Sequence, residues 1–129
     1  MSGRFLLDTS IIVALLRGDT EIRTRLDQAG EIFIPSIVLG ELYYGAHVSQ
    51  RVAENLSQIA AYISDTTVLD CNIDTASAYA VIKSRLRAKG RLLPENDIWI
   101  AATSSQHDLH LVTRDAHFSQ IADLEYSIW

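Results

Sequence analysis

The sequence has few of the residues that mark secreted, membrane-embedded or nucleic-acid-coating proteins. Cys71 is its one cysteine, which excludes an internal disulfide and fits a reducing cytoplasm, the compartment that we expect. Because Cys71 has no evident catalytic partner nearby in the sequence, we expect it to be a small buried apolar residue. No apolar run approaches the length of a membrane span, and Asp8 interrupts the first one, so we expect no signal peptide. The net charge of −5 argues against a protein that simply coats nucleic acid.

The sequence does contain the composition and the alternating pattern of one globular α/β domain. With 129 residues, 48% of them hydrophobic and 21% charged, we expect a single domain over residues 1–129. Strands are expected at Phe5–Leu7, Ile32–Ile34, Val68–Leu69, Leu111–Thr113 and Tyr126–Ile128. Helices are expected over Ser10–Arg17, Thr20–Ala29, Ile37–Ala46 with Ser36 as its cap, Arg51–Ile63, Asn72 or Asp74 to Lys89, Asn96–Gln106 and His117–Ile121. This alternation favours a mostly parallel sheet.

The first apolar run ends in an acid. Phe5–Leu7 is typical of a strand buried on both faces, and Asp8, Thr9 and Ser10 follow before the next apolar segment begins. Asp8 therefore lies where a central strand passes into a helix, at the sheet edge where ligands bind in open α/β folds. The simpler interpretation is that Asp8 or Ser10 only caps the helix.

Three further acids occupy comparable positions. Glu41 interrupts the apolar stripe of the third expected helix, Asp97 lies in the first turn of another, and Asp115 follows a strand. Each has an ordinary alternative explanation. Glu41 could form an ion pair, Asp97 could be favoured there by the helix dipole, and Asp115 could belong to a turn or cap. Because strand ends and the following helix starts share one edge of a parallel sheet, all four acids, including Asp8, could converge on one pocket.

Four carboxylates in one pocket need a counterion, because like charges disfavour one another's ionisation. Oxygen ligands suit Mg²⁺ or Mn²⁺, and such sites commonly hydrolyse phosphodiester bonds. Zinc is less expected, because the four histidines show no metal-type spacing. We expect these histidines to be surface or packing residues: His47, His107, His110 and His117.

Four motifs follow one another in order along the chain: Leu7–Ser10, Ser36–Gly45 around Glu41, Asn96–Ala102 with Asp97, and Thr113–Phe118 with Asp115. This ordered set resembles the PIN-domain nucleases and, more narrowly, the VapC-type toxins of prokaryotic type II toxin–antitoxin pairs. The resemblance implies a PIN-like fold, with helices on both faces of a short parallel sheet. It also implies a Mg²⁺- or Mn²⁺-dependent endoribonuclease that hydrolyses RNA phosphodiester bonds. The implied partners are a second copy in a homodimer and a small antitoxin that blocks the site, joined in a higher-order toxin–antitoxin assembly.

The resemblance also assigns residues by position. The family's catalytic and metal-binding acidic quartet matches Asp8, Glu41, Asp97 and Asp115. The family's accessory hydroxyls beside that quartet match Ser10 and Thr113. The antitoxin is expected to wrap the toxin with its C-terminal tail. Because a guanidinium matches carboxylates with a planar fork, we expect an antitoxin arginine to reach Asp8, Asp97 or Asp115 and compete with the cation. Apolar anchors are expected in a groove near Tyr43 and Tyr44, although these aromatic residues could equally be core.

Two basic features remain open. Arg114 could hold a phosphate or pair with an acid. The stretch Lys83–Arg91 could contact RNA phosphates, or it could be the solvated end of a helix, where cations complement the dipole.

Three other functions fit the residues less well. A Mg²⁺-binding receiver domain needs a lysine after a late strand, but the only lysines, Lys83 and Lys89, lie in one expected helix. An aspartyl phosphatase usually has a second acid two residues after the first, where Ser10 stands. A non-catalytic RNA-binding module is disfavoured by the complete set of four acids.

Overall fold

The structure is a computed structural model that describes residues 3–129, and its centre is a five-stranded sheet in the order β3-β2-β1-β4-β5. Every neighbouring pair of these strands is parallel. The strands are β1 (Arg4–Leu7), β2 (Glu31–Pro35), β3 (Thr67–Leu69), β4 (His110–Thr113) and β5 (Tyr126–Ile128). The expected α/β fold with a parallel sheet is confirmed.

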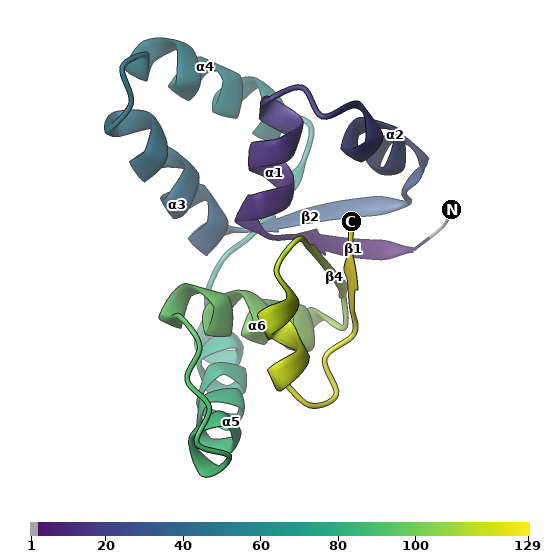
Figure 1. The fold of residues 1–129 in the computed structure, drawn as a ribbon, viewed down its shortest axis with the longest axis vertical. Coiled ribbons are helices and arrows are strands. Elements are labelled where there is room, and N and C mark those ends of the chain that lie inside the picture. Colours follow the sequence, from purple (N-terminus) through teal and green to yellow (C-terminus); the bar gives the residue numbers. More distant parts are fainter. Residues whose placement is uncertain (1–2) are drawn as a thin grey trace.

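The helices form two groups, one on each side of the sheet (Figure 1). One group holds α1 (Thr9–Leu16), α2 (Thr20–Gln28), α3 (Ser36–His47) and α4 (Val52–Ile63). The other holds α5 (Ile73–Ala88), α6 (Glu95–His107) and the short 3₁₀ helix η1 (Ala116–Gln120). With helices on both sides, β1 has no solvent-facing side, which is why Leu6 and Leu7 are fully buried.

The chain order creates a crevice at the end of β1. After β1 the chain adds β2 and then β3 on one side, and later returns to add β4 and β5 on the other. Connections that leave two neighbouring strands in opposite directions open a crevice at their carboxyl ends, the usual ligand position in such sheets. Here those strands are β1 and β4, which are in register at Leu7 and Val112. The backbone N–H of Asp8 extends the pairing by donating to the Val112 carbonyl at 3.2 Å.

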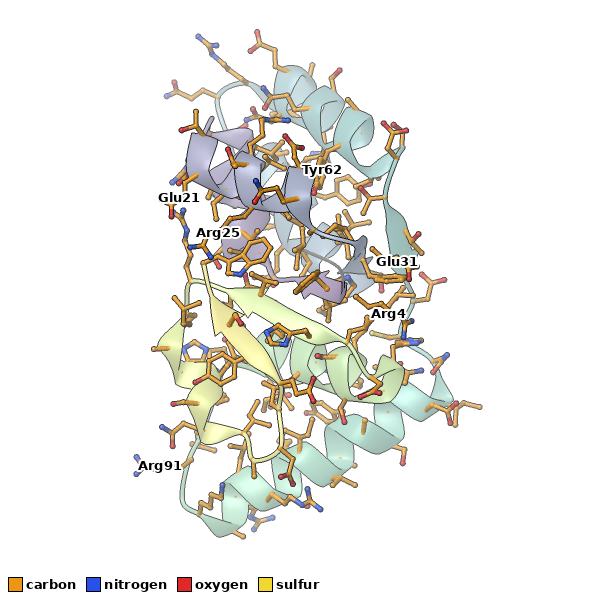
Figure 2. All side chains as sticks on the ribbon, turned by 90° about the vertical axis from the view of Figure 1, so that its right-hand side faces the viewer. Arg4, Glu21, Arg25, Glu31, Tyr62 and Arg91 are labelled. Atoms are coloured by element: carbon orange, nitrogen blue, oxygen red, sulfur yellow. The ribbon has the colours of Figure 1, made fainter. Side chains whose placement is uncertain are left out.

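The opposite, amino-terminal edge of the sheet carries ordinary surface charge. Arg4 of β1 lies 3.8 Å from Glu31 of β2, and Arg25 pairs with Glu21 at 3.6 Å on α2 (Figure 2). Exposed pairs of this kind contribute little to stability, typically about 0–1 kcal/mol. The four acids named from the sequence lie at the other, carboxyl-terminal edge.

Three local expectations differ from the structure. Cys71 is exposed in the loop before α5, so the prediction that it is buried is wrong. Ser36 is the first residue of α3 and makes no side-chain cap, because Pro35 occupies the N-cap position. α6 begins at Glu95, directly after Pro94. Among residues 3–129, no helix is long and apolar enough to cross a membrane.

Candidate active site

Asp8 is held at the junction of β1 and α1 by several hydrogen bonds. Its Oδ1 accepts the Ile11 N–H at 3.3 Å and the Ser10 hydroxyl at 2.5 Å, and its Oδ2 accepts the Thr113 hydroxyl. Only 4% of Asp8 is exposed. Asp8 is thus the N-cap of α1, as the simpler interpretation predicts, and it also lines a pocket at the carboxyl edge of the sheet.

The hydroxyls of Ser10 and Thr113 connect Asp8 to the segment after β4. Thr113 is fully buried, and its Oγ1 accepts the Asp115 N–H at 3.0 Å while the hydroxyl donates to Asp8. The Ser10 Oγ accepts the Arg114 N–H at 3.1 Å. The two hydroxyls therefore hold the acids that follow β1 and β4 in a set relative position.

One pocket of about 550 Å³ brings the four acids of the sequence analysis together. Asp8 comes from the end of β1, Glu41 from α3, Asp97 from the first turn of α6 and Asp115 from the end of β4. Glu41 accepts a hydrogen bond from the Thr9 hydroxyl at 2.9 Å. The remaining lining residues are Thr9, Ser10, Pro94, Glu95, Asn96 and His117.

Glu95, which the patterns in the sequence do not mark, is a fifth acid at this pocket. A hydrogen bond from the Lys83 ammonium, at 2.6 Å, and another from the Tyr79 hydroxyl hold the pKa of Glu95 below its usual value. The hydrogen bonds that Lys83 donates to Glu95 and, at 2.9 Å, to the Tyr79 hydroxyl raise the pKa of Lys83 to about 12. The charge of Glu95 is therefore compensated, and Lys83, from the basic stretch, serves as its partner.

Burial and mutual repulsion oppose the ionisation of two of the acids. Burial is the largest influence on Asp8 and raises its pKa, three hydrogen bonds oppose this effect, and the charge of Asp97 adds to the rise. Burial also raises the pKa of Glu41, and the charges of Asp97 and Asp8 add to that effect. A cation in the pocket would relieve both costs, because an opposite charge favours the ionised carboxylate.

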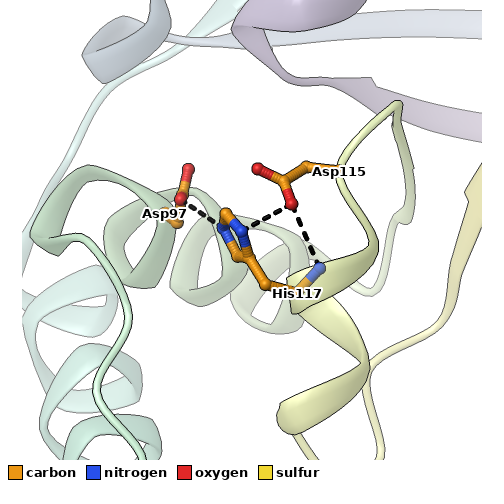
Figure 3. A group of neighbouring side chains, drawn as sticks. All are labelled: Asp97, Asp115 and His117. Atoms are coloured by element: carbon orange, nitrogen blue, oxygen red, sulfur yellow. Dashed lines mark hydrogen bonds and ion pairs between the residues drawn. The ribbon is translucent and has the colours of Figure 1, made fainter.

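His117 lies between two of the acids, so the prediction that it is a surface or packing residue is wrong. Its Nε2 is 2.6 Å from Oδ2 of Asp97, and its Nδ1 is 2.5 Å from Oδ1 of Asp115 (Figure 3). The spacing of two residues from Asp115, at the start of a short helix, was the one signal in the sequence that could have indicated this. His110 agrees with the prediction, since its ring packs edge-on against Phe5.

Arg114 pairs with an acid instead of facing the pocket. Its guanidinium lies 2.6 Å from Oδ2 of Asp19, which is also the N-cap of α2. The pKa of Asp19 is lowered mainly by the Ile22 N–H and then by the Arg114 hydrogen bond. Of the two interpretations of Arg114, the ion pair is the one present in the structure.

The donor atoms in the pocket fit a divalent cation. One atom each from Asp97, Asp115 and His117 can be chosen so that all three lie within 4.8 Å of one another. Asp8 and Glu41 add carboxylate oxygens to the same pocket. Carboxylates are the ligands that Mg²⁺ and Mn²⁺ favour, and the pocket supplies several in a small volume.

Known proteins resemble this chain over almost its whole length. A family model described as the PIN domain matches residues 5–124. Ribonuclease VapC2 of Haemophilus influenzae is 35% identical over 129 residues, a match that covers 98% of each protein. A protein of Shigella flexneri named tRNA(fMet)-specific endonuclease VapC is 30% identical, with 98% of each covered.

Solved structures agree with these sequence matches. VapBC2 from Rickettsia felis, bound to a DNA fragment from its promoter, gives a TM-score of 0.91 at 27% identity, covering 100% of this chain and 99% of that chain. DNA-bound VapBC from Salmonella typhimurium gives a TM-score of 0.90 at 30% identity, covering 98% of both chains. The fold around the pocket is therefore the same in these proteins.

Replacing Asp8 by asparagine should stabilise the metal-free protein at neutral pH. Folding raises the pKa of Asp8. The stability that this group contributes is therefore fully present below the unfolded pKa and is lost as pH rises through the folded pKa. Asp8→Asn removes that charge and keeps an oxygen for the Ile11 N–H, so we expect a gain of about 0.5–2 kcal/mol in the free energy of unfolding. Denaturant titration with a chelator at pH 7 measures it.

The gain from Asp8→Asn should disappear at a pH below the unfolded pKa, where the wild-type acid is protonated in both states. Asp74→Asn is the matched control, because Asp74 is an exposed acid in the first turn of α5. It should bring no gain at either pH. A loss of stability in Asp8→Asn at pH 7 would show that its hydrogen bonds outweigh the cost of burying the charge.

Proposed function

The chain belongs to the PIN-domain family and to its VapC-type ribonucleases of toxin–antitoxin systems, and on that premise we propose that it is a Mg²⁺- or Mn²⁺-dependent endoribonuclease. The observation that carries the proposal is the convergence of Asp8, Glu41, Asp97 and Asp115 on one pocket at the carboxyl edge of the sheet. The cation that these four acids would hold supplies an activated water and stabilises charge on the scissile phosphate.

The protein's own residues give that chemistry its geometry. The Ser10 and Thr113 hydroxyls occupy both oxygens of Asp8 and so set the direction in which its remaining lone pairs point. Glu41 is only half-buried and lines the open pocket, so its carboxylate can reach a water held there and accept a proton from it. We therefore assign Asp8 to binding and Glu41 to binding and proton uptake.

RNA cleavage should depend on Asp97. Asp97→Asn keeps the shape of the side chain but removes a ligand charge, so we expect cleavage with Mn²⁺ or Mg²⁺ to fall by about 10²–10⁴-fold. Purified tRNA(fMet) is a suitable first substrate, since the Shigella flexneri relative is named for that specificity. In cells, expression without a partner should halt growth, and Asp97→Asn should relieve the arrest.

Asp74→Asn is again the matched control, because it removes an acid from the first turn of a helix outside the pocket. It should cleave like the wild type, and a chelator should stop both. Full cleavage by Asp97→Asn would contradict the proposal. Tight RNA binding without cleavage by the wild type would favour the alternative of a non-catalytic RNA-binding module.

We also propose a small antitoxin as partner, whose C-terminal tail brings an arginine to Asp8, Asp97 or Asp115. The structural relatives are VapBC complexes, which supports a partner of this class. A pocket rich in carboxylates attracts a guanidinium, which forms paired hydrogen bonds with them. Tyr43 and Tyr44 are exposed on α3, by 36% and 69%, and are available as apolar anchors.

Cation and antitoxin should compete for the acids. Excess Mn²⁺ should weaken the binding of the co-expressed antitoxin, and Asp97→Ala should weaken it even without metal, because the arginine loses a carboxylate. Calorimetric titration of the purified proteins measures both effects, with Asp74→Ala as the control that leaves affinity unchanged. An affinity indifferent to Mn²⁺ and to Asp97→Ala would place the inhibitory contact away from the pocket.

The chain is proposed to form a homodimer through apolar helix surfaces. Other large apolar side chains are exposed on the described surface, and burying them against a second copy would remove them from water: Val48, Ile73, Val81, Leu92 and Ile128. Light scattering at micromolar concentration should report twice the chain mass of 14.4 kDa. A single-chain mass, with and without antitoxin, would contradict this.

A further inference from the structure

The side chain of His117 gives the pocket a nitrogen donor in addition to its carboxylates. We propose that His117 is a ligand of the metal centre, so that Asp97, Asp115 and His117 form a mixed carboxylate–imidazole site that favours Mn²⁺ and similar transition ions over Mg²⁺. The inference rests on the proposed function, because it concerns the same pocket. It adds a ligand and a metal preference that a purely acidic site does not have.

The position of the ring supports this assignment. Both ring nitrogens already face carboxylate oxygens, Nε2 toward Asp97 and Nδ1 toward Asp115, at 2.6 and 2.5 Å (Figure 3). The three side chains can each present one ligand atom within 4.8 Å of the others. Ligand atoms about 2.1 Å from a small cation lie roughly 3–4 Å from one another. To admit an ion, one of the two hydrogen bonds must therefore lengthen by roughly 0.5–1.5 Å, and the ring nitrogen must give up any proton that it carries. The other ring nitrogen can keep its carboxylate partner, as ligating histidines commonly do.

The surroundings of His117 hold its ring in place. Its backbone N–H donates to Oδ1 of Asp115 at 3.1 Å, and Asp115 is itself held by the Thr113 hydroxyl. The ring stacks on Phe118 with 5.2 Å between centroids, and Phe118 is fully buried. A side chain fixed in this way has lost much of its freedom before metal binds, which favours a ligand over a mobile surface residue.

The chemistry of nitrogen donors predicts which metals depend on His117. Imidazole binds first-row transition ions well, whereas Mg²⁺ prefers oxygen ligands and retains several waters. Loss of the ring should therefore weaken Mn²⁺ binding and leave Mg²⁺ binding little changed. His117 is the only histidine among the residues that line the pocket, so a nitrogen signal from bound Mn²⁺ can be assigned to it.

Pulsed electron paramagnetic resonance of Mn²⁺ bound to the purified protein tests the assignment directly. The wild type should show ¹⁴N coupling, which ¹⁵N-labelled histidine should change and His117→Gln should abolish. By calorimetry, His117→Gln should weaken Mn²⁺ binding about tenfold and Mg²⁺ binding far less. His47→Gln is the control, because His47 is exposed at the end of α3 and should keep both the coupling and the affinity.

Two results would overturn the inference: a wild-type spectrum without ¹⁴N coupling, or an equal loss of Mn²⁺ and Mg²⁺ affinity in His117→Gln. The first needs no variant and so does not depend on how the substitution folds. Nitrogen coupling in a protein that cleaves no RNA would support this inference and contradict the proposed function. RNA cleavage with Mn²⁺ bound but no nitrogen coupling would support the proposed function and contradict this inference.

Discussion

The hydrogen bond from Thr113 to Asp8 joins the ends of the two strands on which the pocket depends. It connects residues 105 positions apart in the sequence, at the point where neighbouring β1 and β4 send the chain in opposite directions. Thr113 also receives the Asp115 N–H, so one buried hydroxyl positions an acid from each strand. The other two acids, Glu41 and Asp97, come from helices that pack onto this same edge. Their distances from Asp8 and Asp115 therefore depend on that junction.

The pocket gathers like charge at some cost to the metal-free fold. Burial raises the pKa of Asp8 and of Glu41, and Asp97 repels both when ionised. The protein offsets part of this cost locally. Thr9, Ser10 and Thr113 donate hydrogen bonds to the carboxylates, Lys83 compensates Glu95, and His117 lies between Asp97 and Asp115. The pocket therefore places acids at positions that stability alone would fill with uncharged residues.

Much of the fold could be predicted because its signals are local. The apolar strands and the helical periodicity predicted most elements to within one or two residues, and the alternation of strand and helix predicted the parallel sheet. A prediction fails where the average burial of a residue type does not match the position of that residue in the fold. Cys71 was expected to be buried because cysteine usually is, but it lies in an exposed loop after β3.

By itself, the sequence determined the four candidate acids. An acid that ends an apolar strand or interrupts an apolar helix face can be recognised from its neighbours in the sequence. It also carried the ordered motifs that the family shares. Only the tertiary structure decided which groups meet. His117 contacts Asp97, Arg114 turns to Asp19, and Lys83 reaches Glu95, although 20, 95 and 12 positions separate these partners. Contacts across such distances depend on the packing of whole elements, which no local pattern encodes.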